Sequence, residues 1–385
     1  MREVDTNPSK WTRGADNWFL TGDPNATEVA DRNAPNSAAI STMNVRASDF
    51  SNIKINGNFQ VQIFGTYGNN SIYVYGPNDG VRDVMIEVQG DTLCINQIQT
   101  KKPAPSIRNV IVRIGVNRLN SVTQLGGGTV EGIQLRSNFM TVTSNGSGNM
   151  YLAGRMNLQR VTNTGRGCIS IFGAITPVLD IKTSGMGTVN VSGNVGVRSI
   201  MHHGRSNINI IGANTNTLKI YADGKGKIGI NGIVNLCELK AHDLAQVYIY
   251  QVKSNDLYVY VYDKARVGLA GTAGNLYIDA FKASCVGARN LCANTAFVRA
   301  HGWSHVNIAA GNKIFAAATE NSSVYFFGSP NVMSQFVRGN GVVIPVWSNA
   351  SSCPIVSRIY SYKGEHVSSY PYTKWNGRPQ LRGEG

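Results

Sequence analysis

Three side chains that could bind a metal or move protons recur at one position of a repeated sequence pattern. His203, Asp223 and His242 each stand five residues before an apolar residue, at intervals of 20 and 19 residues, and His301 holds the same position three repeats later. If each repeat forms one coil of a solenoid, with strands about 4.8 Å apart, these side chains form a column. Imidazole and carboxylate groups in such a column could hold a transition metal or support acid–base chemistry.

The surrounding sequence does not complete a site around this column. No nucleophile or further ligand stands near it in the repeat, and side chains at the corners of coils are often merely solvated. We therefore expect no metal, cofactor or catalytic residue, and we keep His203, Asp223 and His242 as the candidates to inspect.

Other enzyme chemistry lacks its residues as well. Glycosidases and lyases built on a β-helix need clustered carboxylates, or a basic residue near a bound metal. The 22 acidic residues are spread thinly along the repeats. Phosphate-binding loops, Ser/His/Asp arrangements and dinucleotide fingerprints are absent from the sequence. These observations argue against an enzyme.

The column belongs to an internal repeat that runs from Leu119 to Gly328. In each unit a small residue is followed two positions later by an apolar one, in steps that alternate between 20 and 19 residues and shorten to 18 at the end. The small residues are Gly128, Gly148, Gly167, Gly187, Ser206, Gly226, Ala245, Ala265, Ser284, Ser304 and Ser322. The apolar residues are Val130, Met150, Ile169, Val189, Ile208, Ile228, Val247, Val267, Val286, Val306 and Val324.

The pattern within each unit predicts strands. Another apolar residue lies eight positions before the repeated one and a third lies two positions after it, with polar residues such as Asn190 and Asn209 between. This alternation indicates strands with one buried face. Glycines such as Gly154 and Gly193 then suit a corner with positive φ. We predict an all-β fold, a parallel β-solenoid of about eleven coils with at least two short strands in each.

The repeat divides the chain into four segments. Residues 1–44 are polar and rich in structure breakers, as in an arm or linker. Irregular strand-like runs in residues 45–118 predict an N-terminal β cap, and residues 119–328 form the β-helix itself. Residues 329–385 are predicted to be an irregular C-terminal cap and tail. Both ends need covering, because a coil buries its apolar side chains only against its neighbours.

Aromatic residues gather in both terminal segments. The candidates for docking on a partner are Trp11, Trp18, Phe19, Tyr370, Tyr372 and Trp375. Tyr and Trp are enriched in the hot spots of interfaces. The same residue types also suit the capping of a solenoid, so capping and docking both stay open.

The net charge and the cysteine content limit the possible partners and disulfides only broadly. The net charge of +14 is compatible with an acidic partner such as nucleic acid, anionic lipid or acidic polysaccharide, and diffuse surface charge without a specific partner is the simpler interpretation. The basic residues are scattered and form no recognisable nucleic-acid module, so we do not expect nucleic-acid binding. Cys285 and Cys292 are close enough in the sequence to bridge one coil.

No segment of the sequence has the features of a membrane anchor or a leader. Apolar runs stay well short of the roughly 18 residues of a membrane-spanning helix. Residues 1–48 lack the apolar core of a signal peptide.

Four stretches carry a resemblance to a known family. They read FSNIKINGNFQVQI at 50–63, GDTLCI at 90–95, VIVRI at 110–114 and SNGSG at 144–148. The sequence resembles the bacterial putative auto-transporter adhesin family with a head GIN domain. This resemblance implies a right-handed parallel β-helix in an exported or envelope protein.

The resemblance and the repeat together suggest a function. We expect a non-enzymatic protein outside the cytoplasm, in the periplasm, the outer membrane or at the cell surface. It would act as a rigid scaffold for attachment to protein partners in the envelope or on a target surface. A second hypothesis is a structural subunit of a large envelope assembly, such as a secretion-system outer-membrane complex. A carbohydrate-active enzyme is the third.

Overall fold

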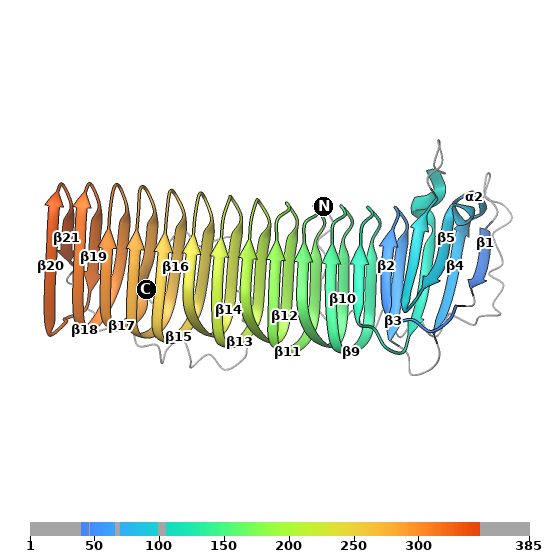
Figure 1. Cartoon of the computed structure of the whole chain (residues 1–385), viewed down its shortest axis with the longest axis horizontal. Helices are drawn as coiled ribbons and strands as arrows, with labels where there is room; N and C mark the ends of the chain where they lie inside the picture. The colour runs from blue at the N-terminus through green and yellow to red at the C-terminus, as the bar shows by residue number, and fades with distance from the viewer. Residues whose placement is uncertain (1–39, 46, 66–69, 99–104, 347–385) are drawn as a thin grey trace, which may run out of the picture.

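Ten long strands, stacked side by side, build the body of the protein and give it the shape of a rod (Figure 1). We describe residues 40–45, 47–65, 70–98 and 105–346 from a computed structural model. The long strands are β9 (Val130–Ser144), β10 (Met150–Asn163), β11 (Ile169–Thr183), β12 (Thr188–His202), β13 (Asn207–Ala222), β14 (Lys227–Ala241), β15 (Gln246–Val261), β16 (Arg266–Ala280), β17 (Cys285–Ala300) and β18 (His305–Glu320).

Each long strand pairs in parallel with the strand of the next coil. Val189 of β12 pairs with Ile208 of β13, which pairs in turn with Ile228 of β14. Partners therefore stand 19 or 20 residues apart, and residues at the same position of the repeat lie side by side. The predicted all-β fold and parallel β-solenoid are confirmed.

A coil contains one bent strand where the sequence predicted two short ones. Gly154, Gly193 and Gly232 lie at the bend, with φ of 151°, 146° and 136°. The pairing of β10 with β9 shifts between Leu152 and Gly154 and then continues. A bulge of this kind turns the chain without ending the ladder of hydrogen bonds. The glycine corners were predicted correctly, whereas the strand breaks were wrong.

The other corner of each coil changes its form along the rod. The first corners contain a Gly-x-Gly sequence, as at Gly146 to Gly148. No residue of these corners has a positive φ. Later corners each contain one left-handed residue. These residues are Gly204, Gly224, Asp243, Asp263, Lys282, Gly302 and Glu320. The small residue of the repeat is glycine at the first kind of corner and mostly Ser or Ala at the second.

Apolar side chains fill the interior in columns that run along the rod. The repeated apolar residues from Val130 to Val324 are at most 3% exposed. The column eight residues earlier, from Val122 to Ala316, is at most 5% exposed. Burying one such aliphatic side chain stabilises a fold by about 1.5–3 kcal/mol. Since neighbouring coils supply the burial, stability is shared between adjacent coils.

The first coil in the sequence is not the outermost coil of the rod. On one side, β2 (Asn52–Asn56) and β3 (Gln60–Gly65) pair in parallel with β8 (Ser121–Gln124) and β9. On the other side they pair in parallel with β6 (Thr92–Gln97) and β7 (Ile111–Val116). The chain therefore builds an outer coil from β6 and β7 and then returns to continue the solenoid from β8.

Antiparallel strands cover this N-terminal end. β4 (Ser71–Pro77) pairs antiparallel with β7, and β1 (Ile40–Val45) pairs antiparallel with β4. β5 (Val84–Gln89) pairs antiparallel with β6. The short helix α2 (Asn78–Arg82) contacts β4 and the 3-10 helix η1 (Pro105–Asn109). The reversed strand direction ends the parallel stacking here.

The C-terminal end is built from further parallel strands. β19 (Ser323–Phe327) pairs with β18. β20 (Val332–Gly339) then pairs with β18 and β21 (Val342–Pro345) pairs with β19, again in parallel. Residues 332–345, which belong to the segment assigned as a cap, thus form an additional coil. Within the described ranges, no strand pairs with the outer edges of β20 and β21.

A substitution at Gly167 tests whether the close approach of neighbouring coils requires glycine at the Gly-x-Gly corners. A Cβ at this position would overlap the carbonyl oxygen of Gly148 in the preceding coil. We expect Gly167→Ala to lower the free energy of unfolding by roughly 1–3 kcal/mol, as overpacking does. Urea unfolding followed by circular dichroism measures the change.

Ser284→Ala is the matched control. Ser284 occupies the same column, and its Cβ is already accommodated. Its buried hydroxyl has no hydrogen-bond partner among the residues that the structure describes. Its unfolding free energy should stay within about 0.5 kcal/mol of wild type. Equal stability of the two variants would show that the glycines are not required for coil spacing.

Candidate functional site

The structure places the predicted histidine–aspartate column at one corner of successive coils. His203 follows β12, Asp223 follows β13 and His242 follows β14. Nδ1 of His203 lies 3.4 Å from Oδ2 of Asp223, and both side chains are partly exposed. The ring of His242 instead stacks on Tyr262, with centroids 4.6 Å apart. The structure therefore brings together two of the three predicted residues as polar partners.

This arrangement does not form a metal centre of the usual size. A protein site for a transition metal normally uses three or four ligands. In the ranges that the structure describes, no group of three His, Cys, Asp or Glu side chains is placed to share an ion. Nδ1 of His301 lies 2.9 Å from Oγ1 of Thr319, a contact that holds the ring at its corner.

Aromatic residues that we did not single out complete the column. The rings of His242, Tyr262, Phe281 and His301 stack in series, with neighbouring centroids 4.6, 5.1 and 4.9 Å apart. Tyr262 and Phe281 were detectable from the sequence, because they follow His242 at the repeat interval. Their rings pack face to face between coils, and this stacking stabilises the corner.

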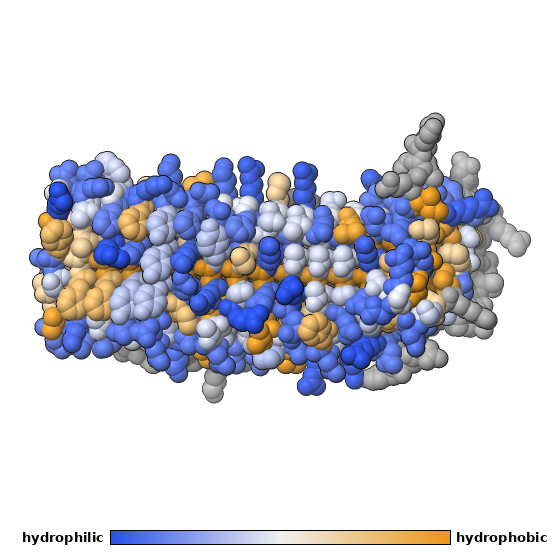
Figure 2. Space-filling model, in the orientation of Figure 1, coloured by the Kyte–Doolittle hydropathy of each residue, from blue (hydrophilic) through white to orange (hydrophobic). Residues whose placement is uncertain are grey.

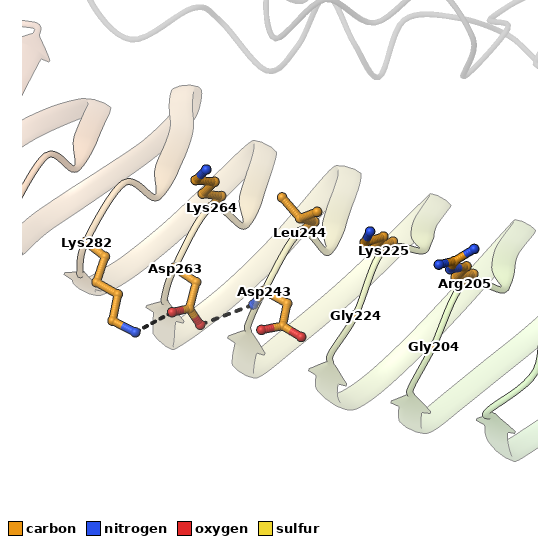
Figure 3. Close-up of a pocket in the computed structure, with 9 residues that line it drawn as sticks. All are labelled: Gly204, Arg205, Gly224, Lys225, Asp243, Leu244, Asp263, Lys264 and Lys282. Carbon is orange, nitrogen blue, oxygen red and sulfur yellow. Dashed lines mark hydrogen bonds and ion pairs between the residues drawn. The ribbon is translucent and has the colours of Figure 1, made fainter.

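A groove runs along the same corner, beside the column (Figure 3). It encloses about 580 Å³ and is lined by Gly204, Arg205, Gly224, Lys225, Asp243, Leu244, Asp263, Lys264 and Lys282. We call these residues the corner groove. Figure 3 shows Arg205, Lys225, Leu244 and Lys264 in one row, with Asp243, Asp263 and Lys282 in a second. Figure 2 shows hydrophilic side chains projecting along the upper edge of the rod, where the long strands end.

Left-handed residues shape the corner groove. The backbone has positive φ at Gly204 and Gly224, and Asp243, Asp263 and Lys282 adopt φ of 57°, 61° and 60°. Aspartate tolerates this conformation better than most residues, because its short side chain can bond to nearby backbone. Between neighbouring coils, Oδ2 of Asp263 accepts a hydrogen bond of 3.3 Å from the N–H of Asp243.

The charges of the corner groove are unequally paired. Nζ of Lys282 donates to Oδ1 of Asp263 at 2.5 Å. This hydrogen bond lowers the pKa of the Asp263 carboxyl and raises the pKa of Lys282. In the described part of the chain, no carboxylate lies within 4.0 Å of the charged ends of Arg205, Lys225 or Lys264. These three cations remain available to an anionic ligand.

The sequence offered a signal for these cations. Arg205, Lys225 and Lys264 stand two positions after the histidine–aspartate column and keep its interval. The scattered basic residues elsewhere in the sequence conceal this second column. Successive coils are about 4.8 Å apart, so Arg205 and Lys225 are neighbours and Lys264 lies about 10 Å beyond Lys225. The result is a line of positive charge along the rod.

A buried histidine next to this site has a structural role. His202 is fully buried, and its Nε2 donates to the carbonyl oxygen of Ser206 at 2.7 Å. Asn163 makes the equivalent bond to Gly167 at 3.0 Å, four residues later in its own coil. Burial lowers the pKa of His202, so the ring stays neutral at neutral pH. The His202 side chain thus holds its corner together from inside the coil, through this hydrogen bond to the backbone.

Two further sequence predictions concern other residues. Cys285 is a free thiol, so the predicted bridge between Cys285 and Cys292 is wrong. Both cysteines lie in β17, where the strand keeps the intervening chain extended. The predicted docking residues Trp11, Trp18, Phe19, Tyr370, Tyr372 and Trp375 lie outside the described residues.

A family model matches two long stretches of this solenoid. The model describes a putative auto-transporter adhesin, head GIN domain, and it matches residues 49–178 and 233–330, together more than half of the chain. The chain belongs to this family. The head GIN domain match omits residues 179–232, which include Arg205 and Lys225 and continue the same parallel stacking. No curated protein matches the chain.

Several crystal structures are similar to this head GIN domain protein. A putative adhesin from Bacteroides fragilis NCTC 9343 is 16% identical, with 80% of this chain and 98% of that chain covered and a TM-score of 0.28. A putative adhesin from Parabacteroides distasonis ATCC 8503 is 12% identical, with 80% and 98% covered and a TM-score of 0.30. A putative lipid binding protein from the same strain is 11% identical, with 80% and 97% covered and a TM-score of 0.28.

Among the residues that the structure describes, no helix combines the length and the hydropathy needed to cross a bilayer.

His202 should make the stability of the protein depend on pH. Its folded pKa is lowered from the ordinary value of about 6.5, so the unfolded chain binds a proton first as the pH falls. The contribution of neutral His202 to the free energy of unfolding is complete above pH 6.5. It is lost as the pH falls below that value, by at most about 1.4 kcal/mol per pH unit. We expect His202→Asn, which imitates Asn163, to show a smaller loss of thermal stability than wild type on acidification.

Asn163→Ala is the control for this titration. The substitution removes the equivalent buried hydrogen bond from a side chain that cannot take up a proton, so it should lower stability without changing how the unfolding temperature depends on pH. Parallel pH profiles for wild type and His202→Asn would show that His202 does not titrate differently in the two states.

Proposed function

We propose that this protein is a non-enzymatic scaffold of the bacterial envelope or cell surface, which attaches to an acidic polysaccharide along the corner groove. The observation that carries the proposal is the row of Arg205, Lys225 and Lys264 on a rigid parallel solenoid. Membership of the head GIN domain family supports an extracytoplasmic attachment role.

The geometry of the corner groove suits an extended ligand. Its cations repeat along the rod at the spacing of coils, so a linear polymer can meet several of them at once without bending. Many exposed ion pairs each contribute little, about 0.2–1 kcal/mol, and act together only when the charges are held in place. The parallel backbone pairing of β12 to β17 holds them in place.

The overall charge favours the same class of ligand. The chain carries 36 Lys and Arg residues against 22 Asp and Glu residues. A positive field of this kind speeds the encounter with a polyanion and weakens as salt is added. Within the corner groove, four cationic side chains face two carboxylates, and Lys282 already neutralises Asp263. The remaining positive charge is what an acidic sugar chain would meet.

The test compares binding of polygalacturonate and neutral dextran to the full-length protein. We expect polygalacturonate to bind, dextran not to bind, and added salt to weaken the complex. The variant Arg205→Gln/Lys225→Gln/Lys264→Gln should bind polygalacturonate about tenfold more weakly, since it loses three ion pairs.

A charge-matched variant separates the corner groove from general positive charge. Lys54→Gln/Lys253→Gln/Lys313→Gln removes three exposed lysines that do not line the corner groove. We expect its affinity to stay within about twofold of wild type. Equal losses in both triple variants would reject the corner groove as the attachment site.

A further inference from the structure

The C-terminal end of the rod exposes a strand that is apolar on both faces. Every residue of β20 is exposed. Met333, Phe336 and Val337 are 53%, 59% and 47% exposed, respectively. Figure 2 shows hydrophobic side chains gathered at this end of the rod, at the left of the view. Exposed apolar residues that cluster in this way mark an interaction surface.

Two of these side chains occupy interior positions of the solenoid. In the parallel pairing of β18 with β20, Met333 lies beside Ile314 and Val337 lies beside Ala318. Ile314 and Ala318 are completely buried. Met333 and Val337 would be buried in the same way if another coil followed, and no described strand covers them. Gln335, which pairs with the buried Ala316, is the one polar side chain between them on this face.

The outer backbone edges at this end have no strand partner among the described residues. β20 pairs with β18 on one edge, and β21 pairs with β19 on one edge. Across the described ranges, no strand pairs with their other edges. Free edges that flank an apolar interior are templates for pairing with another chain.

We propose that a second copy of this chain seats on this end, so that two rods join end to end about a two-fold axis. β20 pairs antiparallel with β20 of the second copy, and β21 pairs with β21 in the same way. Such a contact is self-complementary and closed, because the same surface is used on both sides.

Shape is the first argument for this occupant. The end presents two strand edges at once, β20 and β21, with apolar interior positions between them. A straight extended segment can pair with only one of these edges; to reach both, a segment must bend as β18 does when it pairs with β19 and β20. The same end of a second copy offers both edges in the same arrangement and an equally apolar interior. The N-terminal end does not match it, because the antiparallel strands β1 and β4 lie there.

Charge is the second argument. Arg338 is the only charged residue in β20 and β21. In an antiparallel pair centred on Gln335, Arg338 lies opposite Val332 of the second copy, so like charges do not meet. The net charge of +14 still repels two copies at a distance. Added salt screens that repulsion and should strengthen self-association, whereas it weakens the binding of an acidic polysaccharide.

The experiment measures the oligomeric state and the length of the full chain. Sedimentation equilibrium over a range of protein concentrations, at low and high NaCl, should show a monomer–dimer equilibrium that salt shifts towards dimer. Small-angle X-ray scattering should give the dimer about twice the length of the monomer. This result is independent of polysaccharide binding, so either proposal can fail alone.

Charged residues at the end should abolish the contact. We expect Met333→Lys/Val337→Lys to weaken self-association by at least about 100-fold, because charge would be placed in an apolar contact. The control Ile175→Lys/Met186→Lys introduces the same charge at residues that are 46% and 54% exposed in the middle of the rod, and it should still dimerise. Circular dichroism of all variants checks that they fold.

Three results would overturn the proposal. The first is a wild-type chain that stays monomeric at every concentration and salt level. The second is a Met333→Lys/Val337→Lys variant that folds and dimerises like wild type. The third is a monomer whose β20 amides are protected from hydrogen exchange, because another segment of the same chain would then cover the edge.

Discussion

The parallel pairing of each coil with the next is the constraint on which the rest of the structure depends. Strands that pair in parallel lie about 4.8 Å apart, so every side chain meets the equivalent side chain of the next coil. Inside the rod this favours continuous apolar columns, such as that from Val130 to Val324. At the Gly-x-Gly corners it brings backbones so close that Gly148 and Gly167 have no room for a Cβ. The sequence repeat is the consequence of these contacts.

The same constraint organises the outer surface. Rings stack on rings, as from Tyr258 through Tyr277 and Phe297 to Phe315, with centroids 4.7–5.0 Å apart. Opposite charges meet between coils, as Arg299 does with Asp279. The chemistry of the surface is therefore arranged in lines parallel to the rod. A linear array binds an extended partner better than a compact small molecule, and this favours attachment over catalysis for the corner groove.

The regular spacing of the repeat made the solenoid predictable. The placement of the N-terminal strands was not predictable, because it depends on pairing between distant segments. The interval of 19 or 20 residues predicted which residues become neighbours, including His203 and Asp223. It did not predict that β2 and β3 would lie between coils that follow them in the sequence, because this placement depends on pairing with β6 and β7. The corner groove was missed because its cations Arg205, Lys225 and Lys264 are concealed among many scattered basic residues, and Leu244 interrupts their column.

The two ends of the rod pose the same physical problem and are built differently. A coil has a stable core only if a neighbour covers it on each side. At the N-terminal end, antiparallel strands make the covering surface different from a coil, so stacking cannot continue there. At the C-terminal end, β20 and β21 keep the direction and the interior positions of the coils before them. An end that imitates the body of the rod remains competent to stack, and a surface that resembles it closely is available in a second copy of the same chain.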